Sequence, residues 1–371
     1  MEIDMSEKLK PFYNVGPGEI IQDSLDALAW QQEDLADLTG LSLQTINKLI
    51  KNKQSITVET ANLLGKAFNT SAELWLNLDT AHQLRKHKSG DNEKLTEKKA
   101  RLRKYMPLAE MRKKNWFVYD NDFEGLTLEC RRLFNNDDIV EEVYDSAEMY
   151  CARRGKLEDP YTAWYSQTWY LIAREHAQSI ELPPFNRKRA EKIAQNLSYY
   201  TTQDEGISLF LKELKTAGVG FFVLSHLQKT FLDGASFYAG KNPFIVYTGR
   251  FNRIDNFWFT IAHELAHVLK HLKANGIPIL DNLDNASNSA MEIEADSLAA
   301  QYLHMDEILT EGKKIEKYLT PQRLKTLSAA VGVSIPVVVG ILQHAKILEW
   351  RQFTRYRETV LDKIPIEYIK G

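Results

Sequence analysis

The segment His263-Glu264-Leu265-Ala266-His267 constrains this chain more than any other, because it lies within an apolar run from Phe257 to Leu272. Two histidines four residues apart project from the same face of a helix, which holds their imidazoles close enough to share one metal ion. A helix that is apolar nearly all the way round is buried, and imidazoles and a carboxylate are costly to desolvate there without a partner. The sequence therefore predicts a buried metal-binding helix, in which Glu264 is placed to take a proton from a water held by the ion.

A third protein ligand is expected, because a catalytic zinc site joins three protein ligands to one open position. A predicted helix over residues 289–304 offers two glutamates, Glu292 and Glu294. The one-turn neighbours of Glu294 are largely apolar, whereas those of Glu292 are mostly polar, so Glu292 is expected to be wet. A buried carboxylate needs a compensating charge, and Glu294 is therefore predicted as the third ligand. Asp296 is interpreted either as an orienting partner of a ligand histidine or as a solvated helix aspartate.

Several residues near the metal helix have open assignments. His271 continues the face of the two histidines, either as a supporting or substrate-binding group or as an ordinary helix-end histidine. Asp255 is predicted to cap the start of the helix, and Arg253 to pair with a surface acid. No single group stands out to stabilise an oxyanion, and the candidates are Tyr238, Tyr247, His271 and Tyr302.

Three short segments before the metal helix have the composition of strands: residues 219–224, 235–238 and 243–247. The last two are separated by the turn Ala239-Gly240-Lys241-Asn242. They predict a small antiparallel sheet, whose edge strand would hold an extended peptide by backbone pairing. Helical periodicity dominates elsewhere, so the fold class is predicted to be mainly α with a small β-sheet.

Residues 18–88 are predicted to form five short helices. Gly40 allows a tight turn between the second and third helices, and Ser42 caps the third, which reaches Ile50. This layout is the geometry of a helix-turn-helix module. Amides and hydroxyls read base edges and lysines neutralise phosphates, although each such residue taken singly fits a solvated helix face equally well. The predicted DNA-binding residues are Gln32, Ser42, Gln44, Thr45, Asn47, Lys48 and Lys51.

A chain of 371 residues exceeds the usual single-domain range, and two or three domains are expected. We assign residues 14–88 to the helix-turn-helix domain, 89–215 to a basic linker and helical connector, and 216–371 to the metal-binding domain with its last helices. The formal net charge of -3 gives no global bias toward nucleic acid. No apolar run approaches the roughly 20 residues of a membrane span, and residues 1–10 are too polar for a signal peptide. A cytoplasmic protein without membrane contact is therefore predicted.

Charge is distributed unevenly along the first part of the chain. Residues 1–90 carry 9 Lys/Arg and 12 Asp/Glu, whereas residues 85–114 carry 12 Lys/Arg and 4 Asp/Glu. The first balance predicts weak and strongly salt-dependent DNA binding, unless the acidic first helix faces away from the duplex. The basic stretch is interpreted either as a solvated helix over residues 93–106 or as a source of additional phosphate contacts.

The first domain resembles the HigA-type branch of the Xre-like repressors, the antidote proteins of toxin-antitoxin pairs. The resemblance covers about residues 14–88 and is carried by Pro17-Gly18-Glu19-Ile20, by the turn at Gly40, by Ser55-Ile56-Thr57 and by residues 71–78. It implies operator DNA as a partner, usually bound by a homodimer.

The stretch from about Gly218 to Gln343 resembles the ImmA/IrrE-type metallopeptidases. The residues that carry this resemblance are Arg253, Asp255, Phe257-Trp258-Phe259-Thr260, the segment from His263 to His267, His271, and Glu294-Ala295-Asp296. The resemblance implies that His263, His267 and Glu294 bind the metal and that Glu264 is the general base. It also implies zinc, with manganese as the alternative, and a site-specific endopeptidase of a family whose targets are often Xre-like repressors. The protein substrate is left open between a repressor, a toxin and this chain itself.

Two functional hypotheses follow from these patterns. In the first, a repressor-like DNA-binding module is fused to a metal-dependent endopeptidase. In the second, the chain is a non-catalytic, antitoxin-like transcriptional repressor whose metal site is structural or sensory. The presence of Glu264 favours the first hypothesis, because a purely structural ion gains nothing from a base at that position.

Overall fold

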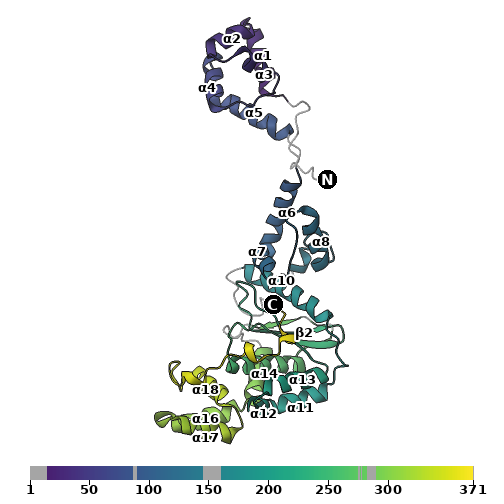
Figure 1. Ribbon diagram of the computed structural model, residues 1–371, viewed down its shortest axis with the longest axis vertical. Helices are drawn as coiled ribbons and strands as arrows, with labels where there is room; N and C mark the ends of the chain where they lie inside the picture. The colour runs from purple at the N-terminus through teal and green to yellow at the C-terminus, as the bar shows by residue number, and fades with distance from the viewer. Residues whose placement is uncertain are drawn as a thin grey trace. The chain divides into compact units, whose positions relative to one another are not determined.

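The structure, a computed structural model, describes residues 15–86, 90–144, 160–274, 276, 278–281 and 290–370. It divides into two compact units, Met1–Glu93 and Lys94–Gly371. Figure 1 shows the helices and strands of both units. The buried hydrophobic clusters of the first unit are separate from those of the second. The predicted fold class is confirmed, since helices dominate the described residues and a small sheet lies in the second unit.

The described part of the first unit consists of five helices, as predicted. They are α1 (Pro17–Leu28), α2 (Gln32–Thr39), α3 (Leu43–Ile50), α4 (Val58–Ala67) and α5 (Ala72–Lys86). Apolar residues at helical spacing meet in one core, which includes Ile21, Leu25, Leu35, Ile46, Leu49 and Trp75. Gly40 follows α2 with a φ of 70°, a left-handed conformation that lets α3 begin after a short turn.

The second unit begins within a helix and continues with helices that share a core with its sheet. They are α6 (Asp91–Tyr105), α7 (Leu108–Lys113), α8 (Phe123–Phe134) and α10 (Pro160–Gln178). Trp169 of α10 and Phe117 belong to the same buried cluster as the sheet residues Phe222 and Phe237. The stretch predicted as a connector is therefore packed into the same unit as the metal helix.

A four-stranded sheet lies in the second unit, with the strand order β1-β3-β2-β4. The strands are β1 (Gly220–Val223), β2 (Gly234–Ala239), β3 (Asn242–Tyr247) and β4 (Ile279–Asp281). β2 pairs antiparallel with β3 and β4, whereas β1 pairs parallel with β3, with Gly220 opposite Phe244. The prediction of an antiparallel sheet was wrong for β1, because β3 lies between β1 and β2 and so separates strands that are neighbours in sequence.

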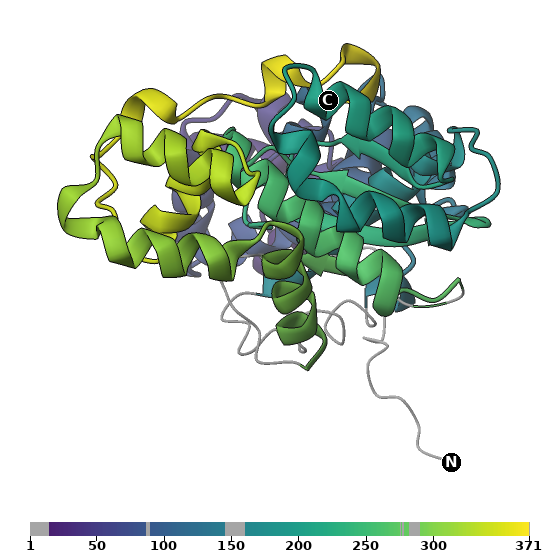
Figure 2. The same cartoon turned by 90° about the horizontal axis from the view of Figure 1, so that it is seen from below.

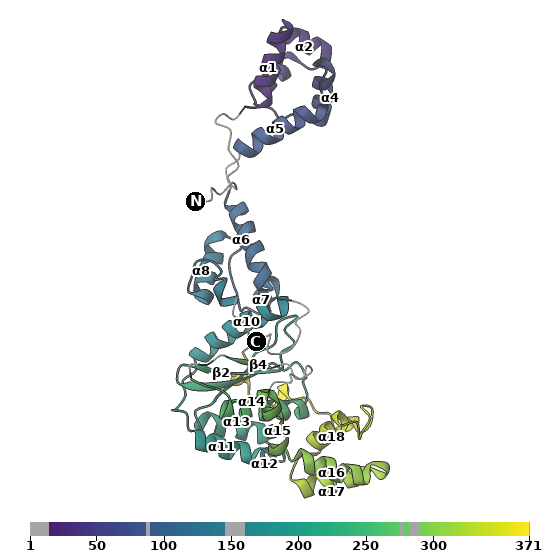
Figure 3. The same cartoon turned by 180° about the vertical axis from the view of Figure 1, so that it is seen from behind.

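A helical layer covers the face of the sheet opposite α10 (Figure 3). Its helices are α11 (Arg187–Gln195), α12 (Leu197–Thr201), α13 (Gly206–Thr216), α14 (Ile254–Lys270) and α15 (Ala290–Tyr302). The predicted metal helix is α14, which packs against β2, β3 and α15. This placement surrounds α14 with protein and explains why its sequence is apolar on nearly every side.

The last part of the chain forms a second helical group and then returns to the sheet. The group contains α16 (Met305–Ile315), η1 (Glu316–Tyr318), α17 (Pro321–Val331) and α18 (Ile335–His344), and it lies to one side of the other helices (Figure 2). The short turns η2 (Thr354–Tyr356), η3 (Leu361–Lys363) and η4 (Ile366–Tyr368) follow. Ile369 then makes a parallel bridge to Val223 of β1.

Among the described residues, no individual helix is both long enough and apolar enough to span a membrane. Only α17 and α18 taken together, with a bend of 102° between them, have the required length and composition.

Candidate metal centre

α14 brings the two predicted histidines together where it faces α15. The Nε2 atoms of His263 and His267 lie 2.9 Å apart. Both side chains are buried, because the sheet, α15 and α18 all pack against α14. Apolar residues such as Ile261, Leu265 and Val268 fill the remaining sides of the helix. The structure therefore places two imidazoles on one face of one helix, as the spacing predicts.

The first turn of α15 supplies a carboxylate to this pair. Glu292 Oε2 lies 3.2 Å from His263 Nε2 and 3.6 Å from His267 Nε2. The ligand atoms of these three residues all lie within 4.8 Å of one another. Two imidazole nitrogens and one carboxylate oxygen are a donor set of catalytic zinc sites, so the residues fit a divalent cation.

Glu294, predicted as the third ligand, does not join this group. Its side chain is 55% exposed, whereas that of Glu292 is 19% exposed, so the burial argument that favoured Glu294 was wrong. The sequence reasoning judged each glutamate by its neighbours on its own helix, whereas the side chain of Glu292 lies against His263 of the packed helix α14. The signal that identifies Glu292 is its spacing: Glu292 and Asp296 are four residues apart, which places both acids on the helix face that meets α14.

The outer nitrogens of the two histidines also have partners. Asp296 Oδ1 lies 2.8 Å from His263 Nδ1. His271 Nδ1 lies 3.0 Å from His267 Nδ1, and His271 Nε2 lies 3.2 Å from Glu294 Oε2. Asp296 is thus the orienting partner of a histidine rather than an isolated surface acid. A histidine whose outer nitrogen is held by an acceptor presents its other nitrogen to a metal in a fixed orientation.

Glu264 is fully buried between α14 and β2. A Cβ atom added at Gly234 would lie 2.3 Å from Glu264 Oε1 and 2.9 Å from Thr260 Cγ2. Only a residue without a side chain leaves room for the carboxylate at this point of the strand. Gly234 is therefore a residue of the site that the sequence reasoning missed, because its contact with Glu264 depends on how the sheet packs against α14.

The start of α14 differs from the prediction. The helix begins at Ile254, so Asp255 lies inside its first turn and is not the cap. Arg253 is the N-cap residue, and its side chain makes no cap hydrogen bond. Arg253 Nε and Nη2 instead donate to the two carboxylate oxygens of Asp255 at 2.9 and 2.6 Å. Asp255 is buried against α18, where a Cβ added at Gly340 would lie 2.2 Å from its Oδ2. The expected cap and surface ion pair are replaced by a bidentate pair at a helix contact.

The candidate oxyanion-stabilising groups differ in their surroundings. The Tyr247 hydroxyl donates to the backbone oxygen of Phe251 at 2.8 Å and is buried, so it is committed to the fold. Burial raises the pKa of Tyr238, and burial followed by the charge of Glu191 raises the pKa of Tyr302. His271 is engaged by two side chains, as described above.

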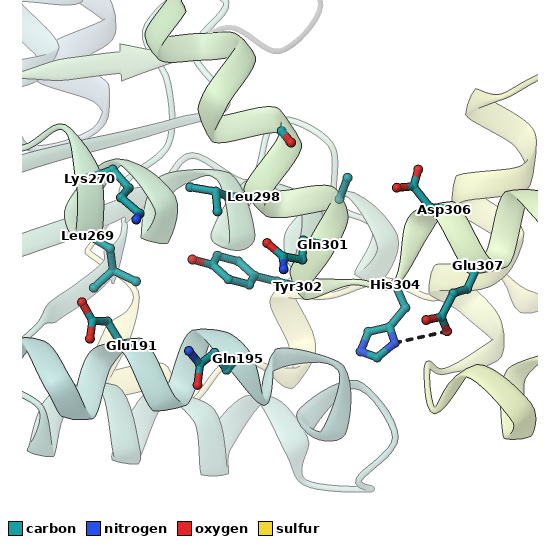
Figure 4. A pocket seen from close by; sticks show the side chains of 12 residues that line it. Glu191, Gln195, Leu269, Lys270, Leu298, Gln301, Tyr302, His304, Asp306 and Glu307 are labelled. Atoms are coloured by element: carbon teal, nitrogen blue, oxygen red, sulfur yellow. Dashed lines mark ion pairs between the residues drawn. The ribbon is translucent and has the colours of Figure 1, made fainter.

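A cavity of about 730 Å³ lies beside the C-terminal ends of α14 and α15 (Figure 4). Tyr302 extends into it between α11 and the end of α14, and the pair formed by His304 and Glu307, 3.5 Å apart, lies on its other side. Its lining residues are Glu191, Gln195, Leu269, Lys270, Ser297, Leu298, Ala300, Gln301, Tyr302, His304, Asp306 and Glu307. The three residues that face one another at the metal centre are not part of this lining, so the cavity is a separate feature of the same helices.

In the first unit, the predicted DNA-binding residues fall into two groups. The Ser42 hydroxyl caps α3 by accepting a bond from the Thr45 backbone N–H at 3.1 Å, and Asn47 Nδ2 donates to Gln32 Oε1 at 3.3 Å. These contacts fix the joint between α2 and α3. The remaining side chains are exposed, and they are Gln44, Lys48 and Lys51.

The basic stretch uses several of its cations for contacts inside the second unit. Lys98 is buried and donates from Nζ to Thr127 Oγ1 at 2.8 Å. Lys114 donates to Ser225 Oγ at 2.7 Å, and burial lowers the pKa of Lys114. Neither of the two interpretations of this stretch anticipated such contacts, which assign these lysines to packing.

Comparisons with known proteins match both parts of the chain. A helix-turn-helix family profile matches residues 21–75, and the profile of the IrrE N-terminal-like domain matches residues 202–339. Residues 202–339 include α14, α15 and the whole sheet. No solved structure matches the chain significantly.

Curated relatives match the first unit. An uncharacterized HTH-type transcriptional regulator of Haemophilus influenzae is 39% identical over 64 residues, which are 17% of this chain and 60% of that protein. The HTH-type transcriptional regulator YddM of Escherichia coli is 35% identical over 68 residues, 18% of this chain and 72% of that protein. Virulence-associated protein I of Dichelobacter nodosus is 32% identical over 72 residues, 19% of this chain and 67% of that protein. The chain thus spans 60% of the length of the first of these relatives. This chain therefore belongs to the HTH-type transcriptional regulators: it has an Xre-like helix-turn-helix domain, fused to a domain of the ImmA/IrrE peptidase type.

Proposed function

We propose that this protein is a DNA-binding transcriptional regulator whose second unit is a zinc-dependent endopeptidase. The observation that carries the proposal is the convergence of two imidazole nitrogens of α14 and one carboxylate oxygen of α15 within 4.8 Å, next to the buried Glu264 of α14. Burying imidazoles and carboxylates together costs free energy unless a partner such as a cation compensates them, and such clusters are typical of functional sites.

His263, His267 and Glu292 would hold the ion, with zinc as the first choice and manganese as the alternative. Their ligand atoms already face one another, so loading requires no exchange of side chains. When bound, the ion supplies Lewis acidity, which makes water a better nucleophile and polarises the scissile carbonyl. Glu294 is replaced by Glu292 in this ligand set.

Glu264 would move the proton during peptide hydrolysis. Its carboxylate takes a proton from the attacking water while the water oxygen forms a bond to the carbonyl carbon. The peptide C–N bond then breaks, and Glu264 passes the proton to the departing amine nitrogen. Close packing of the Glu264 carboxylate against Gly234 restricts its rotamers, which supports a fixed position for this transfer.

The first unit would bind operator DNA through α3. Gln44 is exposed and would read a base edge, while Lys48 and Lys51 are exposed and would contact phosphates. Ser42, Thr45, Gln32 and Asn47 would act mainly by fixing α3 against α2. A homodimer of the HigA type would present two such helices to a palindromic site.

The protein substrate would be a regulatory protein: an Xre-like repressor, a toxin, or this chain itself. The test is incubation of zinc-loaded protein, alone and with candidate regulators encoded beside it, followed by intact-mass spectrometry. A single discrete cleavage that requires zinc supports the proposal. The matched control is Glu264→Gln, which removes the proton-accepting carboxylate and keeps the side-chain shape.

The outcome for Glu264→Gln separates the two hypotheses. An endopeptidase loses cleavage in this variant while zinc binding and DNA binding persist. If instead the variant binds zinc and regulates transcription in cells as the parent does, the non-catalytic repressor with a structural or sensory metal is the correct description.

A further inference from the structure

His271 lies one helical turn beyond His267, at the C-terminal end of α14. Its backbone N–H donates to the His267 backbone oxygen at 2.9 Å, which holds the residue at the helix end. Its side chain is only 7% exposed, although it is not one of the three residues whose ligand atoms converge. A histidine this deeply buried beside a metal centre needs a role that its two ring contacts can explain.

The two contacts of His271 fix which ring nitrogen carries the proton. Glu294 Oε2, 3.2 Å from His271 Nε2, belongs to a carboxylate that can only accept, so His271 Nε2 donates. In a neutral imidazole one ring nitrogen donates and the other accepts, so in that form of His271 the acceptor is Nδ1. His267 Nδ1, 3.0 Å away, must then donate to it.

This chain of bonds determines the state of His267. Once His267 Nδ1 carries the proton, its Nε2 is the unprotonated nitrogen, and Nε2 is the atom that lies 2.9 Å from His263 Nε2 and faces Glu292. His263 is oriented by a different device, the direct contact of its Nδ1 with Asp296 at 2.8 Å. The two histidines are thus oriented differently: His263 by the carboxylate of Asp296, and His267 by His271, which in turn contacts the carboxylate of Glu294.

We propose that His271 is a positioning residue, held by Glu294, that sets the tautomer and ring orientation of His267 for metal binding. The proposal rests on the metal site proposed above and adds to it the two residues that make His267 a competent ligand. It also gives Glu294 a specific role, as the exposed end of a hydrogen-bonded chain that leads to the ion.

The test measures zinc affinity by chelator competition and the visible absorption spectrum of the cobalt-substituted full-length protein. Three variants are compared with the parent. His271→Leu removes both ring nitrogens, His271→Asn restores a side-chain oxygen that can accept from His267 Nδ1, and Glu294→Ala removes the carboxylate. His271→Leu is expected to weaken zinc binding by about 10-fold to 100-fold and to change the cobalt spectrum. His271→Asn is expected to recover most of the affinity, and Glu294→Ala to show a smaller loss.

Glu307→Ala is the matched control, because Glu307 is also an exposed carboxylate paired with a histidine, His304, and lies outside the metal centre. It should leave both readouts unchanged. Parent-like affinity and spectrum in His271→Leu overturn the inference, as does a loss that His271→Asn fails to restore, since packing alone would then explain it. Failure of the parent itself to bind zinc overturns the proposed metal site instead, so the two failures are distinguishable.

Discussion

Glu264 and Gly234 are in direct contact across the boundary between α14 and β2, with room for a hydrogen but not for a methyl group. We expect Gly234→Ala to displace the Glu264 carboxylate and to lower cleavage by at least about tenfold, because general acid–base catalysis contributes on the order of 100-fold or more. Zinc affinity should change little, since neither residue is a proposed ligand. Cleavage rate and zinc affinity are measured on the same preparation.

The control for this substitution is Gly90→Ala, a position where an added Cβ meets nothing within 4 Å. Overpacking at residue 234 is expected to lower the free energy of unfolding by about 1–3 kcal/mol, which denaturant titration would detect. Full cleavage activity in Gly234→Ala would show that the carboxylate has more freedom than the packing indicates.

Glu292 and Glu294 should respond differently to removal. We expect Glu292→Ala to weaken zinc binding by more than about 100-fold, because it removes a ligand, and Glu294→Ala by about tenfold, the lower end of the range for an outer contact. Isothermal titration calorimetry with each purified variant measures both. The reverse order of effects would restore Glu294 as the third ligand and remove Glu292 from the site.

Asp255 of α14 packs directly against Gly340 of α18, where there is no room for a Cβ atom. We expect Gly340→Ala to lower the free energy of unfolding by about 1–3 kcal/mol, because the new methyl group collides with a carboxylate held by Arg253. In the Asp255→Ala background the same substitution should cost less, since the collision is gone. Equal costs in both backgrounds would locate the strain elsewhere on α18.

Cys130 is buried, and loss of hydration raises the pKa of its thiol to about 11. The folded state therefore keeps the proton through the range where an unfolded chain releases it, so this group's contribution to stability declines as pH rises from about 8.5 toward 11. At pH 8 we expect Cys130 to react with iodoacetamide more slowly than free cysteine. Peptide mass spectrometry follows the modification, and a rate equal to that of free cysteine contradicts the burial.

Lys48 and Lys51 are exposed on α3 and at its end, and they should contribute to DNA affinity through phosphates alone. We expect each change to alanine to weaken binding to all duplexes and to reduce the slope of log affinity against log salt by about 1. Lys66→Ala on α4, also exposed, is the control. A slope that stays the same in both α3 variants would exclude α3 as the phosphate-contacting helix.

Features that depend on local spacing were predictable from the sequence. The turn at Gly40, the cap at Ser42 and the pair formed by His263 and His267 all follow from residues within a few positions of one another. The choice between Glu292 and Glu294 was not predictable in the same way. It depends on which face of α15 meets α14, and the burial reasoning erred because it considered only neighbours on the same helix.

The remaining differences have the same cause, since they concern contacts between segments distant in sequence. β3 lies between β1 and β2, which no pattern within those strands specifies. Asp255 meets Gly340 and Glu264 meets Gly234 only after helices and sheet have packed. The lysines at 98 and 114 look like surface cations by composition and are used for packing, because their partners lie 29 and 111 residues away.

The bridge between Ile369 and Val223 has a consequence for solution behaviour. β1 is an outer strand, and an outer strand with free amides and carbonyls invites pairing with another molecule. Ile369 lies along it, and the Lys370 N–H donates to the Val223 oxygen at 2.9 Å. These residues cover part of the outer edge of β1, so we expect a protein shortened before residue 366 to self-associate through that edge even though α14 and α15 are unchanged.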